Sequence, residues 1–157
     1  MTGDNGKRSA GAIDYSPGGS IGYLIRDCNR AFQRLLERRI GPHGVTRGQW
    51  YFLRVLWEQD GLSQRELSAR VGMMEPTTVI ALHSMEKAGL VRRTRSEEDR
   101  RVTRVHLTPK AKRLRSRLLE VSQSVNDEGT VGIDEAELDR VRRVVARITE
   151  NLDRAER

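Results

Sequence analysis

Hydrophobic residues recur every three or four positions along most of the chain, a spacing typical of helices with one buried face. The spacing begins after residues 1–20, whose glycine-rich and polar composition predicts a flexible arm. It predicts six helices, beginning at about residues 21, 46, 63, 76, 109 and 134. Between the fourth and fifth helices, strand-like runs at residues 90–95 and 102–107 flank a charged loop. We therefore expect a mainly α fold with one small β-hairpin.

The order of the predicted elements indicates a fold class. Two short helices joined by a tight turn and followed by a basic hairpin form a winged helix-turn-helix, here at about residues 46–108. The long helices outside it, at about 21–41 and 109–154, carry apolar stripes suited to packing against another helix. We expect one domain over residues 21–157 that dimerises through its N- and C-terminal helices. The residues expected to pair two copies are Leu118, Leu138, Val141, Val145, Ile148 and Leu152.

Charge supports a nucleic-acid partner. The 157 residues carry a formal net charge of +7. The segment from Ser63 to Arg113 holds twelve Lys or Arg against six Asp or Glu, so it accounts for six of the seven charges. No apolar run approaches the length of about 18 residues that crosses a bilayer, and no signal pattern opens the chain, so we expect a cytoplasmic protein without a membrane partner.

The predicted fourth helix would enter the major groove of double-stranded DNA, with backbone N–H groups of its first turn free for phosphate. Its expected contacts are Pro76, Thr77, Thr78, Ala81 and Ser84, while Val79, Leu82 and Met85 would hold it against the body. From the wing we expect contacts from Arg95, Asp99, Arg100 and Arg101. The carboxylate of Asp99 is expected to orient a wing arginine through a charge-assisted hydrogen bond.

Four segments carry a family resemblance: Leu62–Ser68, Glu75–Val79, Met85–Arg93 and Asp99–Pro109. They include Met-Glu-x-x-Gly-Leu at residues 85–90 and an Asp-x-Arg wing at residues 99–101. With these segments the chain resembles the MarR/SlyA family of winged helix-turn-helix transcriptional regulators from the first helix onward. The resemblance implies a homodimer whose two recognition helices, about 34 Å apart, read a pseudo-palindromic operator. One departure is Ile80, where some relatives have an arginine.

The resemblance also implies a ligand pocket between the first two helices and the dimer helices, which takes a small aromatic acid or a related thioester. Its candidate contacts are Arg26, Arg30, His43, Trp50, Tyr51 and Arg54, each of which is equally suited to a core or surface role. The expected mechanism is repression by occupancy, with release of the operator when the anionic ligand binds. Activation by displacing another DNA-bound protein is the near alternative.

Two further rivals belong to other classes. A redox sensor would use Cys28, but this residue lies on the apolar stripe of the first helix, which favours a buried structural cysteine. A helical dimerisation adaptor would not bind DNA at all. The three histidines have no ligand spacing, and no catalytic or phosphate-binding motif stands out, so we expect no metal, no cofactor and no enzymatic activity.

Overall fold

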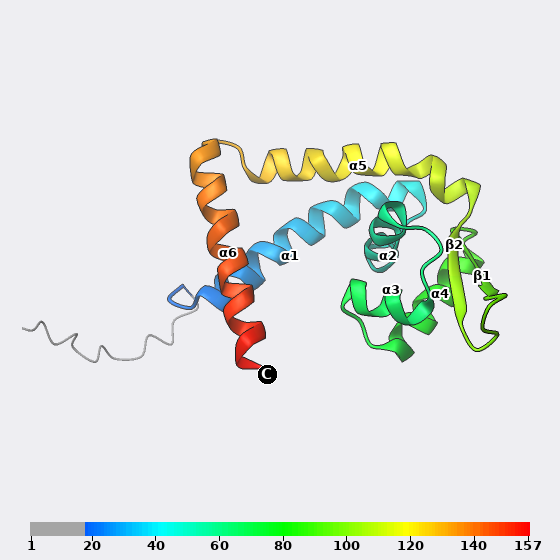
Figure 1. Ribbon diagram of the computed structural model, residues 1–157. Helices are drawn as coiled ribbons and strands as arrows, with labels where there is room; N and C mark the ends of the chain where they lie inside the picture. Colours follow the sequence, from blue (N-terminus) through cyan, green and yellow to red (C-terminus); the bar gives the residue numbers. More distant parts are fainter. Residues whose placement is uncertain (1–17) are drawn as a thin grey trace, which may run out of the picture.

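A computed structural model describes residues 18–157. Residues 1–17 of the arm expected over residues 1–20 lie outside the described range. The described chain is mainly helical with one β-hairpin, as predicted (Figure 1). Its elements are, in order, α1 (Ile21–Ile40), a short 3-10 helix η1 (Gly41–His43), α2 (Arg47–Glu58), α3 (Gln64–Val71), α4 (Glu75–Lys87), β1 (Val91–Arg95), β2 (Thr103–Leu107), α5 (Pro109–Gly129) and α6 (Glu135–Ala155).

Local side-chain caps explain where three of the helices begin. At the start of α2, the Thr46 hydroxyl accepts a hydrogen bond from the Gln49 N–H at 3.3 Å, and the Gln49 side chain accepts one from the Thr46 N–H at 3.0 Å. The same reciprocal pair is formed by Ser63 and Glu66 before α3 and by Asp134 and Glu137 before α6. Each pair satisfies backbone groups that have no partner inside the helix, and the three pairs stand at the helix starts predicted at about residues 46, 63 and 134.

The core lies among α2, α3, α4, the hairpin and the first half of α5. Trp50 and Trp57 meet edge to face, with ring centroids 5.8 Å apart. Buried aliphatic side chains surround them, including Leu53, Leu56, Leu67, Leu82, Met85, Leu90, Val105 and Leu118. This core holds α4 and the hairpin in one rigid lobe.

The hairpin is antiparallel, and Val91 pairs with Leu107 at its base while Arg95 pairs with Thr103 near its tip. The segment between α2 and α3 lies along its outer edge, since the N–H of Val105 donates to the carbonyl of Leu62 at 2.8 Å. This contact between the hairpin and the segment before α3 fixes the wing relative to the start of α3.

Outside the lobe, α5 runs back alongside α1 and leads to α6 at its far end (Figure 1). No residue of α6 is buried, and its packing against the other described elements is marginal at most. Its apolar stripe therefore has no cover within the protomer. Among the described residues, no helix is both long and apolar enough to cross a membrane.

Two predictions about burial are wrong within the protomer. Leu118, assigned to the dimer interface, is fully buried in the core because the first half of α5 packs on the winged-helix lobe. Cys28, expected to be buried, is exposed because α1 and the end of α5 leave an open hollow beside it.

Candidate nucleic-acid interface

Helix α4 turns one face to the core and the opposite face to solvent. Thr78, Leu82 and Met85 are buried, whereas the side chain of Ile80 is 73% exposed. Val79, predicted to hold the helix against the body, is 39% exposed instead. It lies about 100° around the helix from Thr78, which is enough to take it off the buried face.

The prediction that Thr78 contacts DNA is also wrong. Its side chain is fully buried, and its hydroxyl donates to the hydroxyl of Ser68 at 3.1 Å. The Ser68 hydroxyl in turn donates to the carbonyl of Met73 in the turn before α4. Thr78 therefore joins the two helices of the helix-turn-helix and has no access to a DNA groove.

The remaining contacts predicted on α4 lie where a groove can reach them. Pro76, Thr77 and Ser84 are exposed, and Ala81 is half-buried beside them. The hydroxyl of Ser84 accepts a hydrogen bond of 3.3 Å from the buried side chain of Gln49. This bond anchors Ser84 to α2, but a hydroxyl keeps further capacity for a base or phosphate.

The start of α4 is electrically suited to an anion. Among the α-helices of the described chain, α4 alone has an N-cap, Met74, that makes no side-chain hydrogen bond. Free N–H groups and the positive end of the helix dipole are therefore available in its first turn. The sequence analysis expected free N–H groups in this turn, and the structure adds that the N-cap residue, Met74, has no side-chain oxygen with which to cap them.

At the wing, Arg100 and Arg101 are exposed, and neither forms an ion pair within the described residues. The carboxylate of Asp99 accepts a hydrogen bond from the backbone N–H of Arg101 at 2.9 Å. The expectation that Asp99 binds an arginine side chain is thus wrong, because its hydrogen bond is to the backbone N–H of Arg101. Asp99 shapes the turn and leaves the guanidinium of Arg101 free. Arg95 is exposed, and its guanidinium reaches the carbonyl of Arg100 at 3.5 Å.

Two residues beside the wing were missed by the sequence analysis. Gln64 and Arg65, at the start of α3, line a hollow of about 290 Å³ together with Glu75 and Arg101. The hollow thus joins the starts of α3 and α4 to the wing. The signal that marks Arg65 is its place in the first turn of a helix that packs on the wing, which becomes clear only once the fold is known.

Arg93 forms an ion pair with Glu86, so its charge is not free for DNA. Its guanidinium donates to the Glu86 carboxylate at 2.9 and 2.7 Å, and its backbone N–H donates to the same carboxylate at 3.1 Å. The Arg93 guanidinium holds the pKa of Glu86 below its ordinary value, against the opposing effect of partial burial. This pair braces β1 against the second half of α4.

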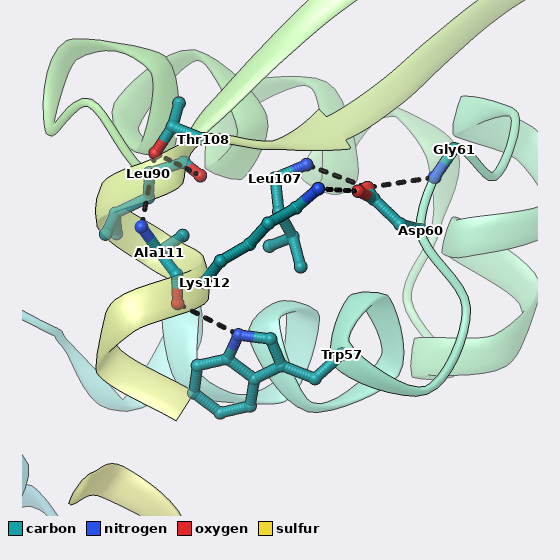
Figure 2. Close-up of polar contacts among 8 residues, drawn as sticks. All are labelled: Trp57, Asp60, Gly61, Leu90, Leu107, Thr108, Ala111 and Lys112. Carbon is teal, nitrogen blue, oxygen red and sulfur yellow. Dashed lines mark hydrogen bonds and ion pairs between the residues drawn. The ribbon is translucent and has the colours of Figure 1, made fainter. Parts of the chain in front are cut away.

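A second brace connects the lobe to α5 (Figure 2). The Asp60 carboxylate accepts hydrogen bonds from the N–H groups of Leu107 at 2.8 Å and Gly61 at 3.0 Å, and Lys112 lies 3.1 Å from its other oxygen. Beside it, the indole of Trp57 donates to the carbonyl of Ala111 at 3.0 Å. Partial burial raises the pKa of Asp60, but these donors outweigh it and leave the pKa below its ordinary value.

The structure brings together only half of the predicted ligand contacts. Trp50, Tyr51 and Arg54 line a hollow of about 260 Å³ among α1, α2 and α5, and Trp50 is otherwise buried in the core. Arg26 and Arg30 lie on the exposed part of α1, where both pair with Asp27, and His43 lies in η1. Sequence reasoning missed the polar members of this hollow, Asn29, Gln33, Ser122 and Asn126.

The arrangement of α3, α4 and the hairpin defines a winged helix-turn-helix protein, in which the uncapped start of α4 and exposed wing arginines lie on the lobe. The MarR family model matches residues 45–103. A MarR transcriptional regulator from Methanosarcina mazei Go1 is 29% identical, with a TM-score of 0.79, over 86% of this chain and 97% of that one. The transcriptional regulator PA3341 is 35% identical, with a TM-score of 0.75, over 86% of this chain and 99% of that one.

A DNA complex is among the similar structures. The transcriptional repressor CouR, bound to a 23-mer DNA duplex, is 25% identical, with a TM-score of 0.78, over 84% of this chain and 94% of that one. The protein belongs to the MarR family of DNA-binding transcriptional regulators.

Proposed function

We propose that the protein is a homodimeric repressor that occupies a pseudo-palindromic operator by binding, without catalysis, in the cytoplasm. The observation that carries this proposal is the convergence of three features on one side of the lobe. These are the exposed face of α4, its uncapped first turn and the unpaired arginines of the wing. We assign groove contacts to Pro76, Thr77, Ala81 and Ser84, and backbone contacts to Arg65, Arg95, Arg100 and Arg101.

The second copy would pack against α6 and the start of α1, at the other end of α5 from α4. Along α6, Val141, Val145 and Leu152 are 55, 40 and 62% exposed, and the less exposed Leu138 and Ile148 continue the same stripe. Exposed Ile21, Leu24 and Ile25 extend the apolar surface onto α1. A surface of this kind on a soluble regulator is suited to a symmetric partner, and symmetry would present two α4 helices to successive major grooves.

The hollow lined by Trp50, Tyr51 and Arg54 is the ligand site that we favour. It offers an aromatic wall, a cation for a carboxylate and several amide side chains, which suits a small aromatic acid or its thioester. Because the hollow lies between α1, α2 and α5, a ligand that prefers one spacing of these helices would shift the dimer toward that spacing. It would release the operator only as far as its affinities for the two geometries differ.

The exposure of Cys28 keeps a redox-responsive regulator as the second candidate. Against it stands the hollow in which the thiol lies, which is lined by Ala31, Phe32, Leu35, Val125 and Gly129, with Glu128 as its charged member. This lining lacks the basic residues that activate thiolates. We therefore expect Cys28→Ser to bind DNA as wild type does, before and after peroxide treatment.

The test is a mobility shift of the purified protein on the DNA upstream of its own coding sequence, with a panel of aromatic acids and their thioesters. Saturable binding that one compound releases would support a ligand-responsive regulator. In vitro transcription from the same DNA separates the two modes, since a repressor lowers transcript and an activator raises it. Binding with no sequence selectivity at any salt concentration would contradict the proposal.

A further inference from the structure

Exposed large hydrophobic residues in the winged-helix segment gather at one place, on α4. Between Val45 and Thr108, a stretch that the structure describes throughout, the exposed large hydrophobic residues are Met74, Val79 and Ile80. All three lie on α4 or on its N-cap, within an otherwise polar and basic lobe. Within the helix itself, Ile80 is the more exposed of the two, at 73% against 39% for Val79.

The helical wheel places Ile80 at the centre of the solvent face. At about 100° per residue, Ile80 lies nearly opposite the buried Thr78, Leu82 and Met85. It also lies one turn after Thr77 and one turn before Ser84, the two exposed hydroxyls of the proposed groove contacts. If α4 enters a major groove, Ile80 is therefore the side chain that goes deepest between them.

The position of Ile80 argues against cover by a second copy of the chain. The apolar stripe of α6 and the exposed start of α1 lie at the opposite end of α5 from α4 (Figure 1). With 21 residues, α5 spans about 30 Å between the two. The surroundings of Ile80 suit DNA instead, because Lys87 is exposed on the same face and the wing arginines lie on the same lobe.

We propose that Ile80 is a specificity-determining residue that packs against the 5-methyl group of a thymine in each half of the operator. The inference rests on the proposed DNA-binding function and deepens it. Among the base edges in the major groove, the thymine methyl is the one apolar group. Guanine and adenine would place donors or acceptors against an alkyl side chain, which is unfavourable without a replacement hydrogen bond, and cytosine lacks the methyl group altogether. The thymine would lie between the bases that face Thr77 and Ser84.

The test begins with selection of duplexes from a random pool by the full-length protein, followed by affinity measurements on the selected site. Each thymine is replaced in turn by deoxyuridine, which lacks only the methyl group. At one symmetric thymine position we expect wild-type affinity to fall about fourfold per half-site, the effect of uncovering one methyl group. Replacement at the other thymines is the internal control.

The matched variants assign the contact. Ile80→Ala should bind the thymine site more weakly than wild type and should no longer distinguish thymine from deoxyuridine at that position. Its salt dependence should equal that of wild type, because no charge is removed. Ile80 is too exposed for this substitution to unfold the lobe, which a thermal melt checks.

Two results would overturn the inference while leaving DNA binding intact. The first is a selected site whose affinity no single deoxyuridine changes. The second is a methyl effect that persists in Ile80→Ala and disappears in Val79→Ala. Failure of the pool to yield any enriched sequence would instead contradict the proposed function itself, and the inference with it.

Discussion

Thr77 and Thr78 are neighbours in α4, yet the helix gives them different surroundings. Thr77 is exposed beside the uncapped first turn, whereas the hydroxyl of Thr78 is buried against Ser68. A one-residue step of about 100° thus separates a proposed groove contact from a structural hydrogen bond. The distinction matters because both residues carry the same side chain, so the environment alone decides the role.

This difference predicts opposite outcomes for the same substitution. Thr78→Val keeps the shape but removes the hydroxyl that bonds Ser68, and it should lower the free energy of unfolding by about 1 kcal/mol without changing the selected DNA sequence. Thr77→Val should leave the melting temperature unchanged and lower operator affinity. Thermal melts and anisotropy titrations on the pair check this. Loss of stability in Thr77→Val, or altered base preference in Thr78→Val, would contradict the assignment.

The placement of Thr78 follows from spacing that the sequence already contains. Thr78 precedes Leu82 by four residues and Met85 by seven, which is the repeat of one helical face. Its hydroxyl made Thr78 a candidate for DNA contact, but its position on the helical wheel places it on the buried face of α4. The guanidinium of Arg93 is a different case, since only the folded hairpin brings it to Glu86.

At the scale of elements, α1 and α5 pack closely because α5 ends in a residue without a side chain. A Cβ at Gly129 would lie 2.5 Å from Cζ of Phe32 and 2.7 Å from Cε1. The aromatic ring therefore occupies the space that a larger residue would need. This contact sets the approach of α5 to α1 next to the hollow that contains Cys28.

Gly129→Ala should displace the Phe32 ring and destabilise the protein by about 1 to 3 kcal/mol, as overpacking does. Gly48→Ala, where nothing lies within 4 Å of the added Cβ, is the matched control and should not destabilise. Denaturant titrations measure both changes. The double variant Gly129→Ala with Phe32→Leu should recover stability, and a Gly129→Ala protein as stable as wild type would show that the packing is looser than described.

The brace at Asp60 connects α2, the hairpin and α5, so its charge state should affect the stability of the lobe (Figure 2). Because folding lowers the pKa of Asp60, its stabilising contribution is present above the ordinary value of 3.8 and is lost as pH falls through the lower folded value. Asp60→Asn should cost about 1 to 3 kcal/mol at neutral pH and progressively less below the ordinary value.

Unfolding curves collected between neutral and acidic pH check the Asp60 prediction. Glu97→Gln, which alters an exposed carboxylate of the wing loop, is the control and should follow wild type throughout. If Asp60→Asn and wild type differ by the same amount at every pH, the carboxylate charge is not what stabilises the brace.

The elements themselves were predictable because their signals are local. Capping boxes at Thr46, Ser63 and Asp134 and the alternation along β2 depend on residues only a few positions apart. Which element covers an apolar stripe is not local. For this reason Leu118 was assigned to a dimer interface and Cys28 to a core, whereas the structure buries Leu118 in the protomer core and leaves Cys28 exposed.

At the scale of the whole molecule, the protomer has a compact winged-helix lobe at one end of α5 and, at the other, a helix whose apolar stripe is uncovered (Figure 1). The two ends have complementary tasks in the proposed dimer. One end presents α4 and the wing to DNA, and the other fixes the spacing between two copies. The proposed ligand, bound in the hollow between α1, α2 and α5, would lie between these ends and would be well placed to change that spacing.

The dimer is tested by placing a charge in the stripe of α6. Val145→Asp should dissociate the protein into monomers and thereby abolish tight operator binding, because an isolated carboxylate is costly to bury. Arg143→Asp introduces the same residue on the opposite face of α6 and should remain dimeric. Sedimentation velocity distinguishes the two, and a dimeric Val145→Asp protein would place the interface elsewhere.

The central claim, that α4 and the wing form a DNA-binding face, is tested most directly by the salt dependence of operator affinity for wild type and Arg101→Ala. The exposed, unpaired guanidinium of Arg101 is proposed to neutralise phosphate. Its loss should weaken binding and reduce the slope of log affinity against log salt by about 1. Arg115→Ala, which removes an exposed charge from α5 instead of from the wing, should match wild type. An unchanged slope and affinity in Arg101→Ala would contradict the account.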